Sequence, residues 1–154
     1  MTLPKISVVI PTYNQAMYLR GAIDSVLNQH YLKWELVLID DASGQDDIKE
    51  LLKYAVSRDK RIRAIFLDQN SGIVNATNCG IKEAKGDFIG FLDHDDELTI
   101  DALYEMVKAI NETESEFIYS DEDKIEMNGT YSDPHFKPDY APEMFLSQNY
   151  ICHL

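Results

Sequence analysis

Short apolar runs alternate with segments of helical periodicity along most of this sequence, and this alternation restricts the fold more than any other feature. The runs are rich in β-branched residues and are bounded by proline, aspartate or glycine, as expected of buried strands. Strands that alternate with helices pair in parallel, because each helix carries the chain back to the starting edge of the sheet. The sequence therefore predicts an α/β fold with a mainly parallel sheet and helices on both faces. The four clear runs are Lys5–Ile10, Trp34–Ile39, Ile62–Leu67 and Asp87–Leu92.

Between the runs, apolar residues recur three and four positions apart, which is the spacing of one buried helix face. This spacing predicts four helices, with Ser43 and Thr99 as caps of the second and fourth, and Gly86 as the glycine that ends the third. The helical faces extend over Leu19–Leu27, Ile48–Val56, Val74–Lys82 and Leu103–Ile110.

The last apolar run and the segment after it carry further expectations. Asp87–Leu92 is almost continuously apolar, which favours a central place in the sheet. Phe117–Tyr119 is expected to start a fifth strand. Asn128-Gly129 has the composition of a hairpin turn.

Composition and charge limit the class of protein. With 154 residues, 45% of them hydrophobic, the chain fits one globular domain, which we expect to span residues 1–154. The formal net charge of −13 argues against nucleic acid as a partner, because phosphate backbones require clustered lysine and arginine. Cys79 and Cys152 are too few for a disulfide framework or a zinc site, so we expect reduced thiols and a cytosolic location. The first ten residues lack the pattern of a signal peptide, and no apolar segment approaches the roughly 20 residues that span a bilayer.

Acidic residues stand directly after three of the four predicted strands. Asp40-Asp41 follow the second strand, Asp68 follows the third, and a run from Asp93 to Glu97 follows the fourth. The carboxyl ends of parallel strands share one edge, and ligands bind there. Carboxylates gathered at that edge would repel one another without a counter-charge. A divalent cation would supply it, and hard oxygen ligands suit Mg²⁺ or Mn²⁺.

Asp93 and Asp95 are the strongest metal-ligand candidates. Alternate residues of an extended segment point the same way, so both carboxylates are expected to face one cation and His94 the opposite side. Asp96 and Glu97 have a second interpretation, as acids at the start of the following helix. No G-x-G-x-x-G or Walker sequence occurs, which argues against a nicotinamide or ATP site.

Several motifs occur together and in order. They are SVVIPTYNQ (Ser7–Gln15), LVLIDDAS (Leu36–Ser43), Asn70-Ser71-Gly72, AKGD (Ala84–Asp87) and FLDHDD (Phe91–Asp96), with YSDEDKI and KPDYAPEMFLSQNYICHL after them. With these motifs the chain resembles the inverting family 2 glycosyltransferases of the GT-A fold, which is Rossmann-like. The resemblance implies transfer of a sugar, with inversion, from a nucleoside diphosphate sugar to a glycan or lipid-linked acceptor. Relatives that carry the last two motifs often build cell-surface polysaccharide or O-antigen, which implies a bacterial protein in the cytoplasm at the inner face of the membrane, with peripheral membrane association.

The resemblance also implies roles for individual residues. Pro11, Thr12 and Tyr13 would lie beside the base and ribose. Asp41 would accept the imide proton of uracil or thymine, which implies a UDP or dTDP donor. Asp93 would reach the ribose or the metal, and Asp95 would ligate the Mn²⁺ or Mg²⁺ ion that bridges the diphosphate. The substrate-binding residues implied in full are Pro11, Thr12, Tyr13, Asn14, Asp41, Asn70, Gly72, Asn78, Asp93 and His94.

Two features depart from the family pattern. Thr77 stands where many relatives carry an arginine that supports the nucleotide. The catalytic base of the family has no match, and we expect it beyond Leu154, so that residues 1–154 would be the donor-binding part of a longer enzyme. Asp121-Glu122-Asp123 is the alternative place for the base, or else a solvated turn.

Two other functions stay open at this point. A non-catalytic module that binds a nucleotide sugar is compatible with the missing base. A phosphoacceptor signalling domain also gathers acids around Mg²⁺ at strand ends, but the acid pair here follows the second strand rather than the first.

Overall fold

The computed structural model describes residues 2–151, which form two compact units divided between Ser115 and Glu116. The first unit is built on a four-stranded sheet in which every pairing is parallel. The strand order is β3-β2-β1-β4. The strands are β1 (Ile6–Thr12), β2 (Trp34–Asp40), β3 (Ile62–Phe66) and β4 (Phe88–Phe91), and the predicted α/β fold is confirmed.

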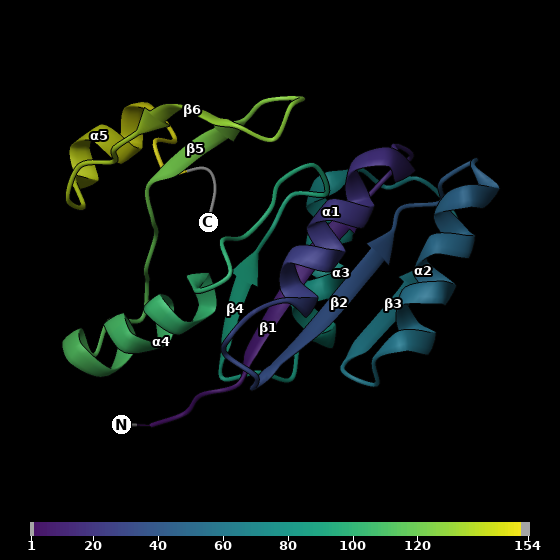
Figure 1. The fold of residues 1–154 in the computed structure, drawn as a ribbon, viewed down its shortest axis with the longest axis horizontal. Coiled ribbons are helices and arrows are strands. Elements are labelled where there is room, and N and C mark those ends of the chain that lie inside the picture. Colours follow the sequence, from purple (N-terminus) through teal and green to yellow (C-terminus); the bar gives the residue numbers. More distant parts are fainter. Residues whose placement is uncertain (1, 152–154) are drawn as a thin grey trace. The chain divides into compact units, whose positions relative to one another are not determined.

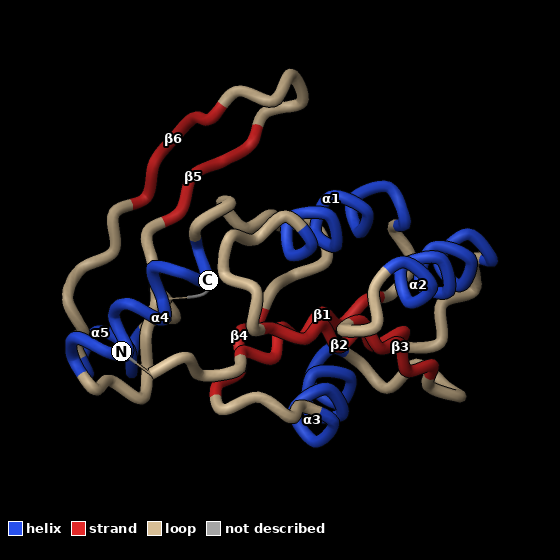
Figure 2. Tube along the Cα trace, turned by 60° about the horizontal axis from the view of Figure 1, so that its bottom comes forward, coloured by secondary structure: helices blue, strands red, loops and turns tan. Residues whose placement is uncertain are grey.

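Helices cover both faces of this sheet. In Figures 1 and 2, α1 (Ala16–Leu27) and α2 (Asp46–Arg58) lie on one face, and α3 (Ile73–Glu83) lies on the other. Successive side chains of a strand point to opposite faces of the sheet. Because helices cover both faces, β1 and β2 are buried along their whole length. Val9, Val37 and Ile39 pack against Ala76 of α3.

The predicted central position of Asp87–Leu92 is wrong. β4 stands at the edge of the sheet, next to β1. Ile89 and Phe91 are 36% and 50% exposed, whereas all residues of β1 and β2 are buried. Apolar content alone therefore did not distinguish an edge strand from a central one.

The helix after β4 is capped from a distant part of the chain. The N-cap residue of this helix, α4 (Ala102–Thr113), is Asp101, and its side chain makes no capping hydrogen bond. The predicted capping by Thr99 is therefore wrong. The N–H of Leu103 instead donates to Oε1 of Gln29 at 2.9 Å, and Nε2 of Gln29 donates to the carbonyl of Thr99 at 2.6 Å. Gln29 is 2% exposed and lies just beyond α1, 74 positions before Leu103, so no local pattern could reveal it.

Two glycines let the chain approach the sheet closely. A Cβ on Gly80 would overlap Cγ1 of Val9, and a Cβ on Gly86 would lie 2.6 Å from the carbonyl oxygen of Lys5. α3 ends at Glu83, before Gly86, and Gly86 has no positive φ. The predicted glycine cap is therefore wrong, and the position is small because it touches the backbone of β1.

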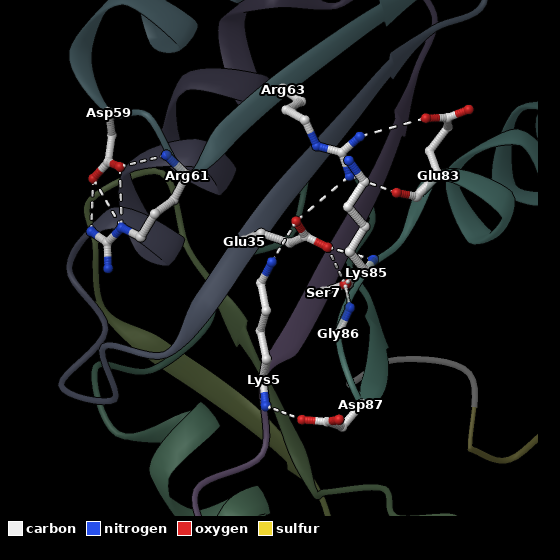
Figure 3. Close-up of polar contacts among 10 residues, drawn as sticks. All are labelled: Lys5, Ser7, Glu35, Asp59, Arg61, Arg63, Glu83, Lys85, Gly86 and Asp87. Atoms are coloured by element: carbon white, nitrogen blue, oxygen red, sulfur yellow. Dashed lines mark hydrogen bonds and ion pairs between the residues drawn. The ribbon is translucent and has the colours of Figure 1, made fainter.

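A buried carboxylate ties that same segment to β1 and β2 at the amino end of the sheet (Figure 3). Glu35 is 5% exposed and accepts hydrogen bonds from Nζ of Lys5 at 2.8 Å, Oγ of Ser7 at 2.6 Å and the N–H of Lys85 at 2.6 Å. Oγ of Ser7 in turn accepts the N–H of Gly86 at 2.8 Å. Burial alone would raise the pKa of Glu35, but the hydrogen bonds and the Lys5 charge outweigh it and lower the pKa to about 2.

The second unit contains a β-hairpin and a short helix. β5 (Glu122–Ile125) pairs antiparallel with β6 (Tyr131–His135), and α5 (Pro142–Ser147) follows. Gly129 has φ 79° between the two strands, so the predicted hairpin turn is confirmed. The predicted fifth strand at Phe117–Tyr119 is wrong, because both rings join an aromatic cluster instead. The centroids of neighbouring rings in this cluster lie 6.1–6.5 Å apart. Its members are Phe117, Tyr119, Tyr140, Phe145 and Tyr150.

No helix within residues 2–151 is long and apolar enough to cross a membrane. Cys79 carries a free, partly buried thiol, and Cys152 lies outside the described residues.

Candidate functional site

The loops that follow the first three strands begin level with one another at the carboxyl end of the sheet. Thr12 pairs with Asp40, and Asp40 pairs with Phe66, at the last position of each strand. The N–H of Asp41 donates to the carbonyl of Thr12 at 2.9 Å, and the N–H of Leu67 donates to the carbonyl of Asp40 at 2.9 Å. The sheet therefore presents three loops along one edge, where α/β folds bind ligands.

The loop after β1 is joined to the loop after β2. Pro11 and Thr12 are buried parts of β1, whereas the ring of Tyr13 is 47% exposed. The N–H of Asn14 donates to Oγ of Ser43 at 2.9 Å, and the N–H of Ser43 donates to Oδ1 of Asp40 at 3.0 Å. Ser43 thus connects the two loops, and its predicted role as the cap of α2 is wrong.

Backbone strain collects in these two loops. Asn14, Gln15 and Ala42 all have left-handed backbones, with φ of 58°, 63° and 58°. Each such residue other than glycine costs about 1–2 kcal/mol. Strain of this kind is typical of binding and catalytic sites, where the surrounding structure holds it in place.

Buried polar atoms without a partner lie at the same edge. Within residues 2–151, Oγ1 of Thr12, Oδ1 of Asn14 and Oδ2 of Asp40 are buried and accept or donate no hydrogen bond. An unsatisfied buried polar group costs roughly 1–3 kcal/mol, so three of them at two neighbouring strand ends are unusual for a purely structural region.

The loop after β3 is held by Asp41. This residue is 3% exposed, and its Oδ1 accepts both the N–H of Ser71 at 2.8 Å and its hydroxyl at 2.9 Å. Oδ2 accepts the N–H of Gly72 at 2.8 Å. Asn70 is exposed beside this turn. Asn78, another predicted substrate residue, is exposed on α3 and makes no hydrogen bond to the other predicted residues in the described part of the chain.

The acids after β4 form a turn rather than an extended segment. The N–H of Asp96 donates to the carbonyl of Asp93 at 3.2 Å, so the predicted alternation of side chains is wrong. His94 does not point away from its neighbour, because its Nδ1 lies 3.9 Å from Oδ1 of Asp95. Its Nε2 lies 3.3 Å from Oε1 of Gln15, which links this turn to the loop after β1.

The donor set of this turn fits a cation that is shared with a ligand. Among residues 2–151, no three histidine, cysteine, aspartate or glutamate side chains are arranged to hold a metal ion by themselves. Asp95 is 53% exposed, and Asp93 is partly exposed with no side-chain partner in the described chain. Mg²⁺ is usually held by one or two carboxylates together with substrate phosphates, and two open carboxylates meet that requirement. The interpretation of Asp96 and Glu97 as first-turn acids is wrong, because α4 begins only at Ala102.

Two of the three alternative acids have partners in the second unit, whereas Asp123 is exposed. Oδ1 of Asp121 accepts the N–H of Lys137 at 2.7 Å. Glu122 lies 3.3 Å from Nδ1 of His135 and 3.1 Å from Nζ of Lys137. Both carboxylates therefore serve the hairpin and the segment after it.

Sequence reasoning missed the residues that join the loops. Ser43, Ser71 and Gln15 carry those connections, yet each is a common polar residue without a distinctive spacing. The only signal was their presence inside the ordered motifs.

Comparison with known proteins agrees with this geometry. The family model described as glycosyl transferase family 2 matches residues 7–152. An uncharacterized protein of Sinorhizobium fredii is 42% identical over 153 residues, which cover 98% of this chain and 17% of that protein. The O-antigen biosynthesis protein RfbC of Myxococcus xanthus is 37% identical over 152 residues, or 97% of this chain and 12% of that protein. The crystal structure of S. aureus TarS 1–349 in complex with UDP-GlcNAc matches 72% of this chain and 32% of that chain, with TM-score 0.66 and 31% identity. The chain thus spans less than a fifth of the length of these two sequence relatives.

Proposed function

Because the chain belongs to glycosyl transferase family 2, we propose that it binds a nucleoside diphosphate sugar at the carboxyl end of its sheet and serves the transfer of that sugar to an acceptor hydroxyl. The observation that carries the proposal is the joining of the loops after β1, β2 and β3 by hydrogen bonds at one edge. The similarity to TarS, which was crystallised with UDP-GlcNAc, supports a nucleotide sugar as the ligand.

The nucleotide would lie against the loops after β1 and β2. The half-exposed Tyr13, which follows the buried Pro11 and Thr12, would contact a base or ribose. Asp41 would accept the imide N–H of uracil or thymine, a donor that adenine does not present there. The donor would therefore be of the UDP or dTDP type, with Asn14, Asn70, Gly72 and Asn78 as further contacts.

The diphosphate would be bound at the turn after β4. Asp93 and Asp95 would hold a Mn²⁺ or Mg²⁺ ion jointly with it, and His94 would line the same turn. Such an ion supplies positive charge where the departing diphosphate gains negative charge. Asp93 and Asp95 would contribute two solvent-accessible carboxylates just after β4.

The acceptor would be a glycan or a lipid-linked sugar, and the anomeric carbon would be inverted. The name of the Myxococcus xanthus relative, an O-antigen biosynthesis protein, supports a polysaccharide pathway. The transfer would then take place in the cytoplasm, at the inner face of a bacterial membrane.

A second candidate is a module that binds the nucleotide sugar without turnover. The observation that favours it is that Asp121 and Glu122 already bind partners in their own unit, which assigns two of the three alternative acids a structural role.

Calorimetric titration tests the proposal. We expect UDP to bind in the presence of Mn²⁺ and to bind at least about tenfold more tightly than ADP, the effect of one hydrogen bond to a charged acceptor. Absence of UDP binding would refute the proposed function, and equal affinities would refute base selection by Asp41. Incubation with UDP-GlcNAc and a glycan acceptor then separates the candidates, because binding without transfer supports the module and robust transfer excludes it.

A further inference from the structure

The helix that leaves the proposed nucleotide site has no cap of its own. α3 begins after Gly72, carries no acid in its first turn and receives no side-chain cap from its N-cap residue. Gly72 has φ 83°, a backbone that other residues rarely adopt. The N–H groups at a helix start need acceptors, and their combined dipole favours a negative charge nearby.

Asp41, just after β2, supplies an acceptor to the N-cap residue Gly72 and to Ser71 before it. Its carboxylate receives three hydrogen bonds of 2.8–2.9 Å, all from Ser71 and Gly72. Hydrogen bonds to an ionised carboxylate are stronger than those between neutral groups. At 3% exposure this carboxylate is shielded from water, so the three bonds are its main solvation.

Among residues 2–151, no hydrogen bond from outside α3 other than those of Asp41 holds this turn. The remaining hydrogen bonds of Ser71 and Gly72 in the described chain run to α3 itself, from Nδ2 and N–H of Asn75 and from the N–H of Ala76. A Cβ built on Gly72 would meet no atom within 4 Å, so the turn is open on that side of Gly72. The position of the turn therefore depends on Asp41.

The acceptor capacity of Asp41 is nearly full before any nucleotide arrives. A carboxylate offers about four acceptor positions, two on each oxygen. Oδ1 uses both of its positions for Ser71, and Oδ2 uses one for Gly72. One position on Oδ2 is left, which is enough for a single imide N–H.

From this arrangement we infer that Asp41 is a positioning residue, which sets the Asn70–Gly72 turn and the start of α3 for any nucleotide. Direct reading of the base is then a second use of the same group. The inference rests on the proposed function, because it assigns the turn to the nucleotide site. It predicts that loss of the carboxylate weakens the binding of all nucleoside diphosphates, not of UDP alone.

Two variants separate positioning from direct reading alone. Asp41→Asn is expected to speed amide hydrogen exchange at Ser71 and Gly72 and to weaken ADP by a factor of about ten, as the loss of charged hydrogen bonds predicts. UDP should weaken by that factor and additionally by the loss of the bond to its base, so that its preference over ADP also shrinks. Ser71→Ala keeps the carboxylate but removes one donor, and is expected to weaken both nucleotides less, with a visible rise in exchange at Gly72. Under direct reading alone, Ser71→Ala would leave UDP affinity unchanged or raise it, because it frees an acceptor position. Ser57→Ala, which removes an exposed serine on α2 that bonds only to the Tyr54 carbonyl, is the control and should change nothing.

Each outcome decides a different point. Unchanged exchange at Ser71 and Gly72 in Asp41→Asn, or a loss confined to UDP, would overturn the inference. If the unaltered protein binds no nucleotide, the proposed function is refuted. Faster amide exchange at Ser71 and Gly72 in Asp41→Asn would in that case still show that Asp41 fixes the turn. Should Asp41→Asn fail to fold, Ser71→Ala decides, because only positioning predicts weaker binding of both nucleotides.

Discussion

Glu35 shows how one ionised side chain can stabilise a fold through its protonation state. Its pKa is lowered to about 2, against an ordinary value of 4.5, because three donors and the Lys5 charge together outweigh the effect of burial. A lowered pKa in the folded state means that the unfolded chain binds the proton first. The stabilisation is therefore complete above the ordinary pKa and is lost as the pH falls towards about 2.

The pH dependence of stability tests this role. We expect the unaltered protein to lose about 3 kcal/mol more unfolding free energy than Glu35→Gln between neutral pH and about pH 2, since one pKa unit corresponds to about 1.4 kcal/mol. Urea denaturation at a series of pH values measures the difference. Glu83→Gln is the control, because Glu83 is 48% exposed and pairs with Arg63 at the surface. Parallel pH profiles for the unaltered protein and Glu35→Gln would contradict the assignment.

Asp95 gives the matching prediction at the proposed metal site. Asp95→Asn keeps the shape of the side chain and removes one charge, so Mn²⁺-dependent UDP binding should weaken at least about tenfold, or ~1.4 kcal/mol. Addition of EDTA should have a similar effect on the unaltered protein and little further effect on the variant. Glu97→Gln removes a nearby exposed charge that is not assigned to the metal, and should leave the affinity within about twofold, as expected for an exposed charge. Insensitivity of UDP binding to both EDTA and Asp95→Asn would remove the metal from the proposal.

At the scale of elements, the hydrogen bonds that cap two helices join parts that are distant in sequence. Gln29 satisfies the first turn of α4, and Asp41 satisfies the turn before α3. Periodicity predicted where these helices lie, because the buried face of a helix is a local property. The caps escaped prediction, because a donor and an acceptor 74 positions apart leave no local pattern.

Gln29 and Thr99 form a pair of variants for this point. Gln29→Ala removes a buried amide with hydrogen bonds to α4 and to the segment before it, so we expect a loss of roughly 2–3 kcal/mol in unfolding free energy. Amide exchange at Leu103 should also rise. Thr99→Ala should be close to neutral, because the Thr99 side chain makes no hydrogen bond in the described chain although its sequence position suggests a cap. Equal losses in the two variants would contradict capping by Gln29.

The limits of sequence reasoning at the site have the same physical origin. The residues at the strand ends were found because strand ends follow from the apolar runs. The turn from Asp93 to Asp96 was not predicted, because its shape is set by the hydrogen bond from the N–H of Asp96 to the carbonyl of Asp93. Phe117 and Tyr119 have the composition of a strand, but contacts with Tyr140 and Tyr150 place them in an aromatic cluster.

At the scale of the molecule, the first unit contains nearly all of the buried apolar core. Among residues 2–151, Tyr150 is the single buried apolar residue that lies after Ser115. A fragment of residues 1–115 is therefore expected to fold and to melt in one cooperative transition. Circular dichroism during thermal unfolding measures this. A fragment of residues 1–98 lacks α4 with its buried Leu103 and Val107, and should melt at a clearly lower temperature. Failure of the longer fragment to fold would show that the second unit is required for the first.

A buried acid stands at each end of β2, Glu35 within the strand and Asp41 just after it, and both face the side of the sheet that α3 covers. Glu35 binds the segment just after α3, and Asp41 binds the turn just before it. Between these anchors lie 11 helical residues, whose Ala76 and Gly80 must face the sheet. One inserted residue would turn half of the helix by about 100° and break either the packing or an anchor. Across the homologues of this protein, insertions and deletions should therefore be rare between positions 71 and 86 and should collect in unanchored places such as the tip of the β5–β6 hairpin.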